Sequence, residues 1–451
     1  MRRTTCQTHA GIIGGFWLLA MLAVLSGVDV SAQSVDAAFK RFWEARNPQE
    51  AGRAAADIVR SGVTFDEALA RLKRGRPYRP DVPRGIVRLS RRSGSQVFYY
   101  DLNVPATYDP SRTYQLRVQL HGGVMGQETS QPRGDGSIGE MAGPDEVEQI
   151  YLLPCSWKDA PWWTDAQLEN LRAILDSVKR TYNIDENRVV LAGVSDGATA
   201  AFYVAMRDTT LFASFLPLNG YVMVLANPSV GAEGDLYPNN FRNKPFFIVN
   251  GGADALYPRR LIDPYIEHLT NGGVIVDYRP QPTSGHNLSW WPELKEDFEA
   301  FVRAYPRDPL PTFLTWENGG DESTNRAHWL VIDRISPTRE SRQLFPDLDE
   351  FDMSEEQPSS PRLITHMGRY GRVDLWRAGN SVEAHTRGVG AFTLLLSPDA
   401  FDFAQPVKVV VDDRVVFEER VRPSLATLMK WAARDNDRTM LFGVELQIEI
   451  E

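Results

Sequence analysis

The sequence is poor in cysteine, which limits both its cross-links and its redox chemistry. Only Cys6 and Cys155 occur among 451 residues. Cys6 lies in an N-terminal segment that we expect to be removed, so the mature chain would hold one thiol and no internal disulfide. Cys155 follows an apolar stretch and is expected to be a buried, inert side chain. A chain of this length can bury a large core, so packing alone is expected to stabilise it.

Basic charge and long apolar runs are also scarce. The chain holds 49 Lys and Arg against 59 Asp and Glu, a formal net charge of −10. Nucleic-acid binding depends on a basic surface that neutralises phosphates, so no nucleic-acid partner is expected. Beyond the N-terminal segment no apolar run approaches the length of a membrane span, and no integral membrane association is expected. Histidine and cysteine show no clustered ligand spacing, so we expect no metal and no cofactor.

Residues 1–32 have the pattern of a secretory signal. Arg2 and Arg3 form a basic start, residues 11–25 form a short apolar run, and residues 30–32 are small, as signal peptidase requires. The expected mature chain begins at Gln33 and is secreted or periplasmic. An uncleaved N-terminal anchor is the alternative.

The remaining chain divides into three regions. Residues 33–84 read as a helical extension, with Asn47 before Pro48 and Thr64 before Glu67 as N-terminal caps. In residues 85–305 short β-rich runs alternate with helical ones, which predicts an α/β domain with a parallel sheet covered by helices on both faces. Residues 306–451 predict a mostly antiparallel, sandwich-like β domain.

Two features of the C-terminal region have specific interpretations. The stretch 336–361 is acidic and rich in serine and proline, and we interpret it as a mobile insertion. Asp412-Asp413 stands between two valine-rich runs and predicts a hairpin turn.

The strongest chemical signal is Gly193-Val194-Ser195-Asp196-Gly197. It follows a predicted strand and opens a helix of small residues, as in a nucleophile elbow that exposes a serine hydroxyl. The glycines two positions before and after Ser195 remove side chains that would collide in such a turn. An ordinary glycine-rich turn with a capping serine is the alternative.

A serine hydroxyl becomes a useful nucleophile only when a base removes its proton. His286 follows a predicted strand, and loops at the carboxyl ends of parallel strands meet above the sheet where the elbow points. Asp254 follows another strand and is the candidate carboxylate that orients the imidazole. The chain order Ser195, Asp254, His286 suits such a triad. Asp263, expected on a helix, and Asp277, within a strand, are the rival acids.

When a serine attacks a carbonyl group, negative charge develops on the carbonyl oxygen, and backbone N–H donors are needed to stabilise it. Gly122 and Gly123 follow a strand upstream of the elbow, and with the N–H of Asp196 they are the candidate oxyanion hole. His121 is expected to brace that loop rather than to transfer protons.

With these residues the chain resembles the α/β-hydrolase superfamily, notably secreted esterases of the feruloyl-esterase and polyhydroxybutyrate-depolymerase type and prolyl-oligopeptidase-like catalytic domains. The resemblance covers roughly residues 85–305 and implies an acyl-enzyme mechanism. Ala198 departs from the family, which usually has another glycine there. No β-propeller precedes the domain and no paired-Glu motif is evident, which weakens the oligopeptidase interpretation. The matching segments are 104–110, 120–123, 182–197, 250–254 and 284–286.

Five tryptophans fall in segments expected to flank the site: Trp157, Trp162, Trp163, Trp290 and Trp291. An aromatic wall would suit an aryl or sugar-linked ester. Core or loop anchors are the alternative.

Together these observations predict a secreted serine hydrolase that cleaves small-molecule or polymer-linked carboxylic esters. A serine peptidase and a non-catalytic binding protein on a hydrolase scaffold are the alternatives. The β domain could contact carbohydrate or a protein partner.

Overall fold

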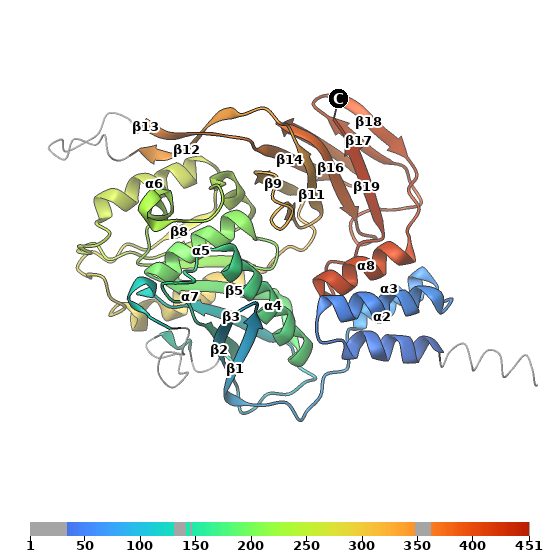
Figure 1. Cartoon of the computed structure of the whole chain (residues 1–451), viewed down its shortest axis with the longest axis horizontal. Helices are drawn as coiled ribbons and strands as arrows, with labels where there is room; N and C mark the ends of the chain where they lie inside the picture. Colours follow the sequence, from blue (N-terminus) through green and yellow to red (C-terminus); the bar gives the residue numbers. More distant parts are fainter. Residues whose placement is uncertain (1–33, 130–140, 145–146, 348–361, 451) are drawn as a thin grey trace, which may run out of the picture.

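The computed structural model describes residues 34–129, 141–144, 147–347 and 362–450 (Figure 1). The expected signal segment and the second half of the acidic stretch lie outside the described residues. Across the part of the chain that is described, no helix is both long and apolar enough to cross a membrane.

The first half of the fold is an eight-stranded sheet in the order β1-β2-β4-β3-β5-β6-β7-β8. Strands β1, β2 and β4 pair antiparallel, and every pair from β4 to β8 is parallel. The strands are β1 (Gly85–Ser93), β2 (Gln96–Val104), β3 (Tyr114–Leu120), β4 (Gln149–Pro154), β5 (Ile184–Val194), β6 (Ser214–Leu218), β7 (Phe246–Ile248) and β8 (Val276–Tyr278).

Helices cover both faces of this sheet. The main helices are α4 (Asp165–Thr181), α5 (Asp196–Arg207), α6 (Arg259–Asn271) and α7 (Trp291–Ala304). Alternate residues of β5 point to opposite faces, as in any strand. Val189 and Leu191 join the core beneath α4 and α5, whereas Val190 and Ala192 join the core beneath α7. The predicted α/β class is therefore confirmed.

The C-terminal half contains two further sheets packed face to face, in the orders β18-β17-β15-β14-β9 and β10-β11-β16-β19. Both contribute to one apolar core that includes Leu375 and Phe392, which makes the predicted sandwich. One pair, β15 with β17, is parallel. The strands are β9 (Phe313–Asn318), β10 (Arg326–Ala327), β11 (Leu330–Ile335), β14 (Gly371–Ala378), β15 (Ser381–Arg387), β16 (Val389–Leu396), β17 (Val407–Val411), β18 (Arg414–Glu419) and β19 (Val444–Glu449).

The predicted turn at Asp412-Asp413 joins β17 to β18, with φ angles of 46° and 67°. Aspartate is among the few residue types that tolerate this left-handed backbone.

The interpretation of 336–361 as a mobile insertion needs correction. Within the stretch, β12 (Glu340–Asp347) is a strand, and it pairs antiparallel with β13 (Arg362–Gly368), which directly follows the stretch, as a separate two-stranded sheet. This arm reaches from the β domain across α6 (Figure 1). Acidic and serine-rich composition favours solvated chain, but backbone hydrogen bonding between strands does not depend on side-chain polarity. Residues 348–361 lie outside the described part.

The N-terminal helices pack on the C-terminal end of the chain. Three helices share an apolar core with α8 (Leu425–Asp435): a helix over residues 34–44, α2 (Pro48–Arg60) and α3 (Phe65–Arg74). Figure 1 shows the N-terminal helices beside α8. Both predicted caps are confirmed. The Asn47 side chain accepts the Glu50 N–H at 2.9 Å, and Thr64 accepts the Glu67 N–H at 3.2 Å.

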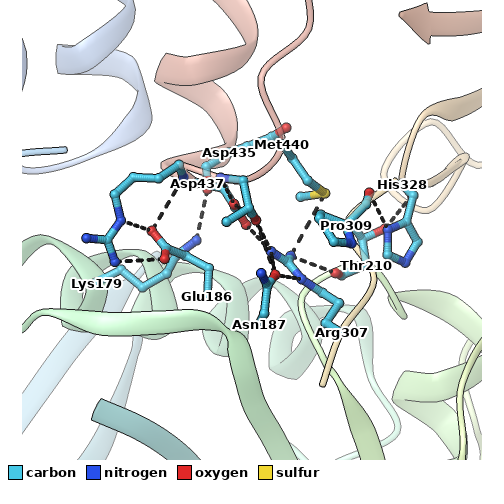
Figure 2. A network of polar contacts seen from close by, with 12 residues as sticks. Lys179, Glu186, Asn187, Thr210, Arg307, Pro309, His328, Asp435, Asp437 and Met440 are labelled. Carbon is cyan, nitrogen blue, oxygen red and sulfur yellow. Dashed lines mark hydrogen bonds and ion pairs between the residues drawn. The ribbon is translucent and has the colours of Figure 1, made fainter. Parts of the chain in front are cut away.

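Buried polar groups fix the β domain against the sheet (Figure 2). Arg307 donates to Asp437 at 2.7 Å and to Asn187 at 2.9 Å, and the ion-paired side chains are each 1% exposed. Burial alone would raise the pKa of Asp437, but the charges of Arg307 and Lys179, together with hydrogen bonds from Thr439 and Arg307, outweigh burial and lower that pKa. Arg438 pairs with Glu186 at 2.7 Å beside this network. Removing one partner of such a buried pair leaves an uncompensated charge, so the junction resists separation.

Candidate active site

Ser195 stands at the sharp turn from β5 into α5 with φ 55° and ψ −116°. Only close packing makes so strained a backbone persist. A Cβ added at Gly193 would lie 2.0 Å from the Gly197 carbonyl oxygen, and one added at Gly197 would lie 2.2 Å from the Leu120 oxygen. Both glycines are therefore required by the elbow, for the steric reason that the sequence suggested.

The structure brings His286 and Asp254 to this serine. His286 Nε2 lies 2.9 Å from Ser195 Oγ, and His286 Nδ1 lies 2.7 Å from Asp254 Oδ2. The Asp254 side chain is 0% exposed, whereas that of His286 is 24% exposed. The contacts fit a tautomer in which Nδ1–H donates to the carboxylate and Nε2 accepts the serine proton.

The carboxylate of Asp254 is held by its own loop. Its Oδ1 accepts the N–H groups of Leu256 at 2.8 Å and Tyr257 at 3.0 Å, which leaves Oδ2 for the imidazole. The rival acids have other partners. Asp263 pairs with Arg259 at 2.8 Å, and Asp277 pairs with Arg279 at 2.6 Å.

The candidate oxyanion donors gather at the same serine. A Cβ added at Gly122 would lie 2.8 Å from Ser195 Cβ, and Gly123, with φ 65°, precedes the short helix η1 (Val124–Gly126). The Asp196 carboxylate accepts the Val124 N–H at 2.7 Å and so ties the two loops together. The backbone N–H of Asp196 opens α5, where the first N–H groups have no intrahelical acceptor and the helix end carries partial positive charge.

His121 holds the loop of Gly122 and Gly123 in place, as expected. Its Nδ1 lies 3.0 Å from the Gly122 oxygen, and its Nε2 accepts the Ser156 N–H at 3.1 Å. The Trp162 indole N–H donates to the His121 carbonyl at 2.9 Å, and this hydrogen bond also holds the loop in place.

The expected aromatic wall needs correction. The five tryptophans are between 1% and 7% exposed, so none presents a ring face to a substrate: Trp157, Trp162, Trp163, Trp290 and Trp291. They anchor the core and the loops instead. Their sequence positions were near the site, but the direction in which each indole points depends on tertiary packing.

Asn219 is a positioning residue that the sequence analysis missed. It has φ 52°, is 1% exposed and directly follows β6. Its Nδ2 donates to the Asn287 carbonyl at 2.8 Å, and its Oδ1 accepts the Gly251 N–H at 3.2 Å. Asn219 therefore ties together the loops that carry the base and the acid. The signal available was an Asn-Gly pair directly after a buried strand.

Gly220 accounts for the departure at Ala198. A Cβ added at Gly220 would lie 2.4 Å from Ala198 Cβ. The extra methyl group on α5 is accommodated because its neighbour has no side chain.

Among the residues whose placement is described, no group of three or more His, Cys, Asp or Glu side chains could hold a metal ion.

No protein-family model matches the chain, and no curated protein matches it in sequence.

Solved structures are similar over about half of the chain. A thermostable esterase aligns with 49% of this chain and 63% of its own, at 21% identity and a TM-score of 0.41. A dipeptidyl aminopeptidase IV-like protein from Bacteroides ovatus aligns with 49% of this chain and 36% of its own, at 15% identity and a TM-score of 0.41. The S-formylglutathione hydrolase FrmB from Staphylococcus aureus aligns with 49% of this chain and 99% of its own, at 18% identity and a TM-score of 0.37. Neither activity nor substrate transfers to this chain at that level of likeness.

Proposed function

We propose that this protein is a serine hydrolase that cleaves carboxylic esters through an acyl-enzyme intermediate. Ser195 Oγ attacks the ester carbonyl carbon while His286 Nε2 takes the hydroxyl proton. His286 then returns that proton to the departing alcohol, and the acyl group stays on Ser195. Water, activated by the same imidazole, attacks the acyl-enzyme and releases the acid. Asp254 holds the imidazole in the required tautomer and stabilises its cation.

Backbone donors complete the proposed mechanism. The N–H of Asp196, with those of Gly122 and Gly123 as candidates for the second donor, would stabilise the oxyanion of each tetrahedral intermediate. Losing one such donor typically lowers kcat by about 10²–10³.

The observation that carries the proposal is the continuous contact chain from Asp254 Oδ2 through His286 to Ser195 Oγ, at 2.7 Å and 2.9 Å. A serine that only caps a helix has no need of this arrangement. The buried carboxylate also matches the requirement for a fixed imidazole.

The test is turnover of a panel of acyl, feruloyl, acetyl-sugar and peptide substrates by the full mature chain. Ser195→Ala should abolish ester hydrolysis, whereas Ser289→Ala, at an exposed serine in the His286 loop, should retain it. Ester hydrolysis that survives Ser195→Ala would refute the assignment. Cleavage of peptides without esters would favour the peptidase, and a folded chain inert to every substrate would favour the binding protein.

We also propose that the chain is exported, on the pattern of residues 1–32. Mass spectrometry of the protein recovered from the culture medium or periplasm should find Gln33 as the first residue. A full-length N-terminus held in the membrane fraction would instead support an uncleaved anchor.

A further inference from the structure

The negative charge of Asp196 lies beside the nucleophile and is not balanced by a described cation. The side chain is half-buried, and its carboxylate accepts the Val124 N–H at 2.7 Å. Within the described ranges, no lysine or arginine is within ion-pair distance of it. The other carboxylate of the site, Asp254, accepts a hydrogen bond from His286 Nδ1 at 2.7 Å. The site therefore carries excess negative charge next to Ser195.

A pair of tyrosine rings packs beside His286. The Tyr257 ring packs edge-on against His286 with centroids 5.4 Å apart, and Tyr221 lies 5.8 Å from Tyr257. Burial, then the charges of Asp196 and Asp254, raise the pKa of Tyr257 to about 12. The phenol consequently remains protonated, and its ring lies within electrostatic reach of the Asp196 carboxylate.

Aromatic faces and an unbalanced carboxylate are the groups that recognise organic cations. The face of a tyrosine ring attracts an ammonium group, most strongly where water is displaced. A carboxylate near the oxyanion would by itself oppose the negative charge that forms during catalysis. A positive group bound between this carboxylate and the rings would offset that repulsion, whereas a negative group would add to it.

We infer that Asp196, Tyr221 and Tyr257 form a subsite for a positively charged group, of the alkylammonium class, on the substrate of Ser195. The inference rests on the proposed ester hydrolysis and adds a preference to it. Esters with an ammonium group near the scissile bond react faster than neutral esters of equal shape, and anionic esters react more slowly.

The test compares acetylthiocholine with its neutral isostere, in which a tert-butyl group replaces the trimethylammonium group. The full mature chain should show a kcat/KM ratio of about tenfold in favour of the cation, which corresponds to about 1.4 kcal/mol. The ratio should fall as ionic strength rises, because the charge involved is partly exposed. The neutral ester serves as the internal reference for any general loss of activity.

Asp196→Asn is the decisive variant. Its amide oxygen can still accept the Val124 N–H, so the loop connection is retained while the charge is removed, and the ratio should fall toward one. Asp263→Asn, which removes a carboxylate from α6, is the matched control and should keep the wild-type ratio.

The rings are tested separately in case Asp196→Asn does not fold. Tyr221→Leu should lower the ratio, and Tyr221→Phe, which keeps the ring, should preserve it.

Each result decides between the two proposals. Equal rates for the two esters in the wild type, or a ratio that Asp196→Asn leaves unchanged, would overturn the cation subsite and leave ester hydrolysis standing. Failure to turn over every ester in the panel would refute the proposed function itself.

Discussion

Replacement of Asp254 by asparagine should inactivate the proposed ester hydrolase by reversing the tautomer of His286. In the wild type Oδ1 accepts two backbone N–H groups, at 2.8 Å and 3.0 Å, and Oδ2 faces His286 Nδ1. An asparagine amide must keep its oxygen toward those two donors, because its NH₂ group would meet them donor to donor. The NH₂ then faces Nδ1, which must accept. The proton moves to Nε2, which can no longer take one from Ser195.

The expected loss follows from that geometry. An aspartate-to-asparagine change that leaves a triad in the wrong tautomer lowers kcat by about 10⁴. Because the shape is nearly unchanged, KM and thermal stability should change little. Steady-state hydrolysis of p-nitrophenyl acetate, with circular dichroism to check folding, measures both. Asp263→Asn is the control and should stay within about twofold of wild type. A loss below about tenfold at Asp254, or a large loss at Asp263, would refute the assignment of the acid.

Three further changes test the elbow, the domain junction and the β domain. Gly197→Ala places a methyl group 2.2 Å from a backbone oxygen and should destabilise the fold by about 3 kcal/mol or more, seen as a lowered Tm; an unchanged Tm would contradict the packing described. Burial, then the charges of Lys244 and Arg307, lower the pKa of His328 well below its ordinary 6.5. The folded protein therefore holds His328 in its neutral form. The free energy of unfolding should be highest above about pH 6.5 and should fall by up to about 1.4 kcal/mol for each pH unit below that value. Urea unfolding should show that the free energy of unfolding depends less on pH in His328→Asn than in the wild type. An identical slope against pH in the two proteins would argue against protonation of His328 as the cause. Deletion of 306–451 should yield no folded monomer by size-exclusion chromatography, because α8 completes the core of the N-terminal helices; a stable, active fragment would contradict that dependence.

Sequence patterns predicted those residues of the candidate site whose placement depends on the backbone. Ser195 was evident because the elbow needs glycines at fixed offsets, which close approach of the chain imposes. Asp254 and His286 could be predicted to lie near Ser195 because loops after parallel strands converge at one edge of a sheet. The α/β class and the sandwich followed from the alternation of apolar runs.

Side-chain direction and long-range packing were beyond those patterns. All five tryptophans turn into the core, and the aromatic groups at the site are tyrosines such as Tyr257. Contact between the N-terminal helices and α8 joins residues almost four hundred positions apart, and no local period encodes it. The β12–β13 arm was missed because acidic and serine-rich composition favours solvated chain, whereas the hydrogen bonds that pair the two strands are made by the backbone and do not depend on side-chain polarity.

The central claim is that Ser195 is the nucleophile. Its most direct test is peptide mapping by mass spectrometry after the full mature chain reacts with a fluorophosphonate. We expect a single covalent adduct on the peptide that contains Ser195, and its loss when His286 is replaced by alanine. A folded protein that forms no adduct, or one that forms it on another serine, would contradict the claim.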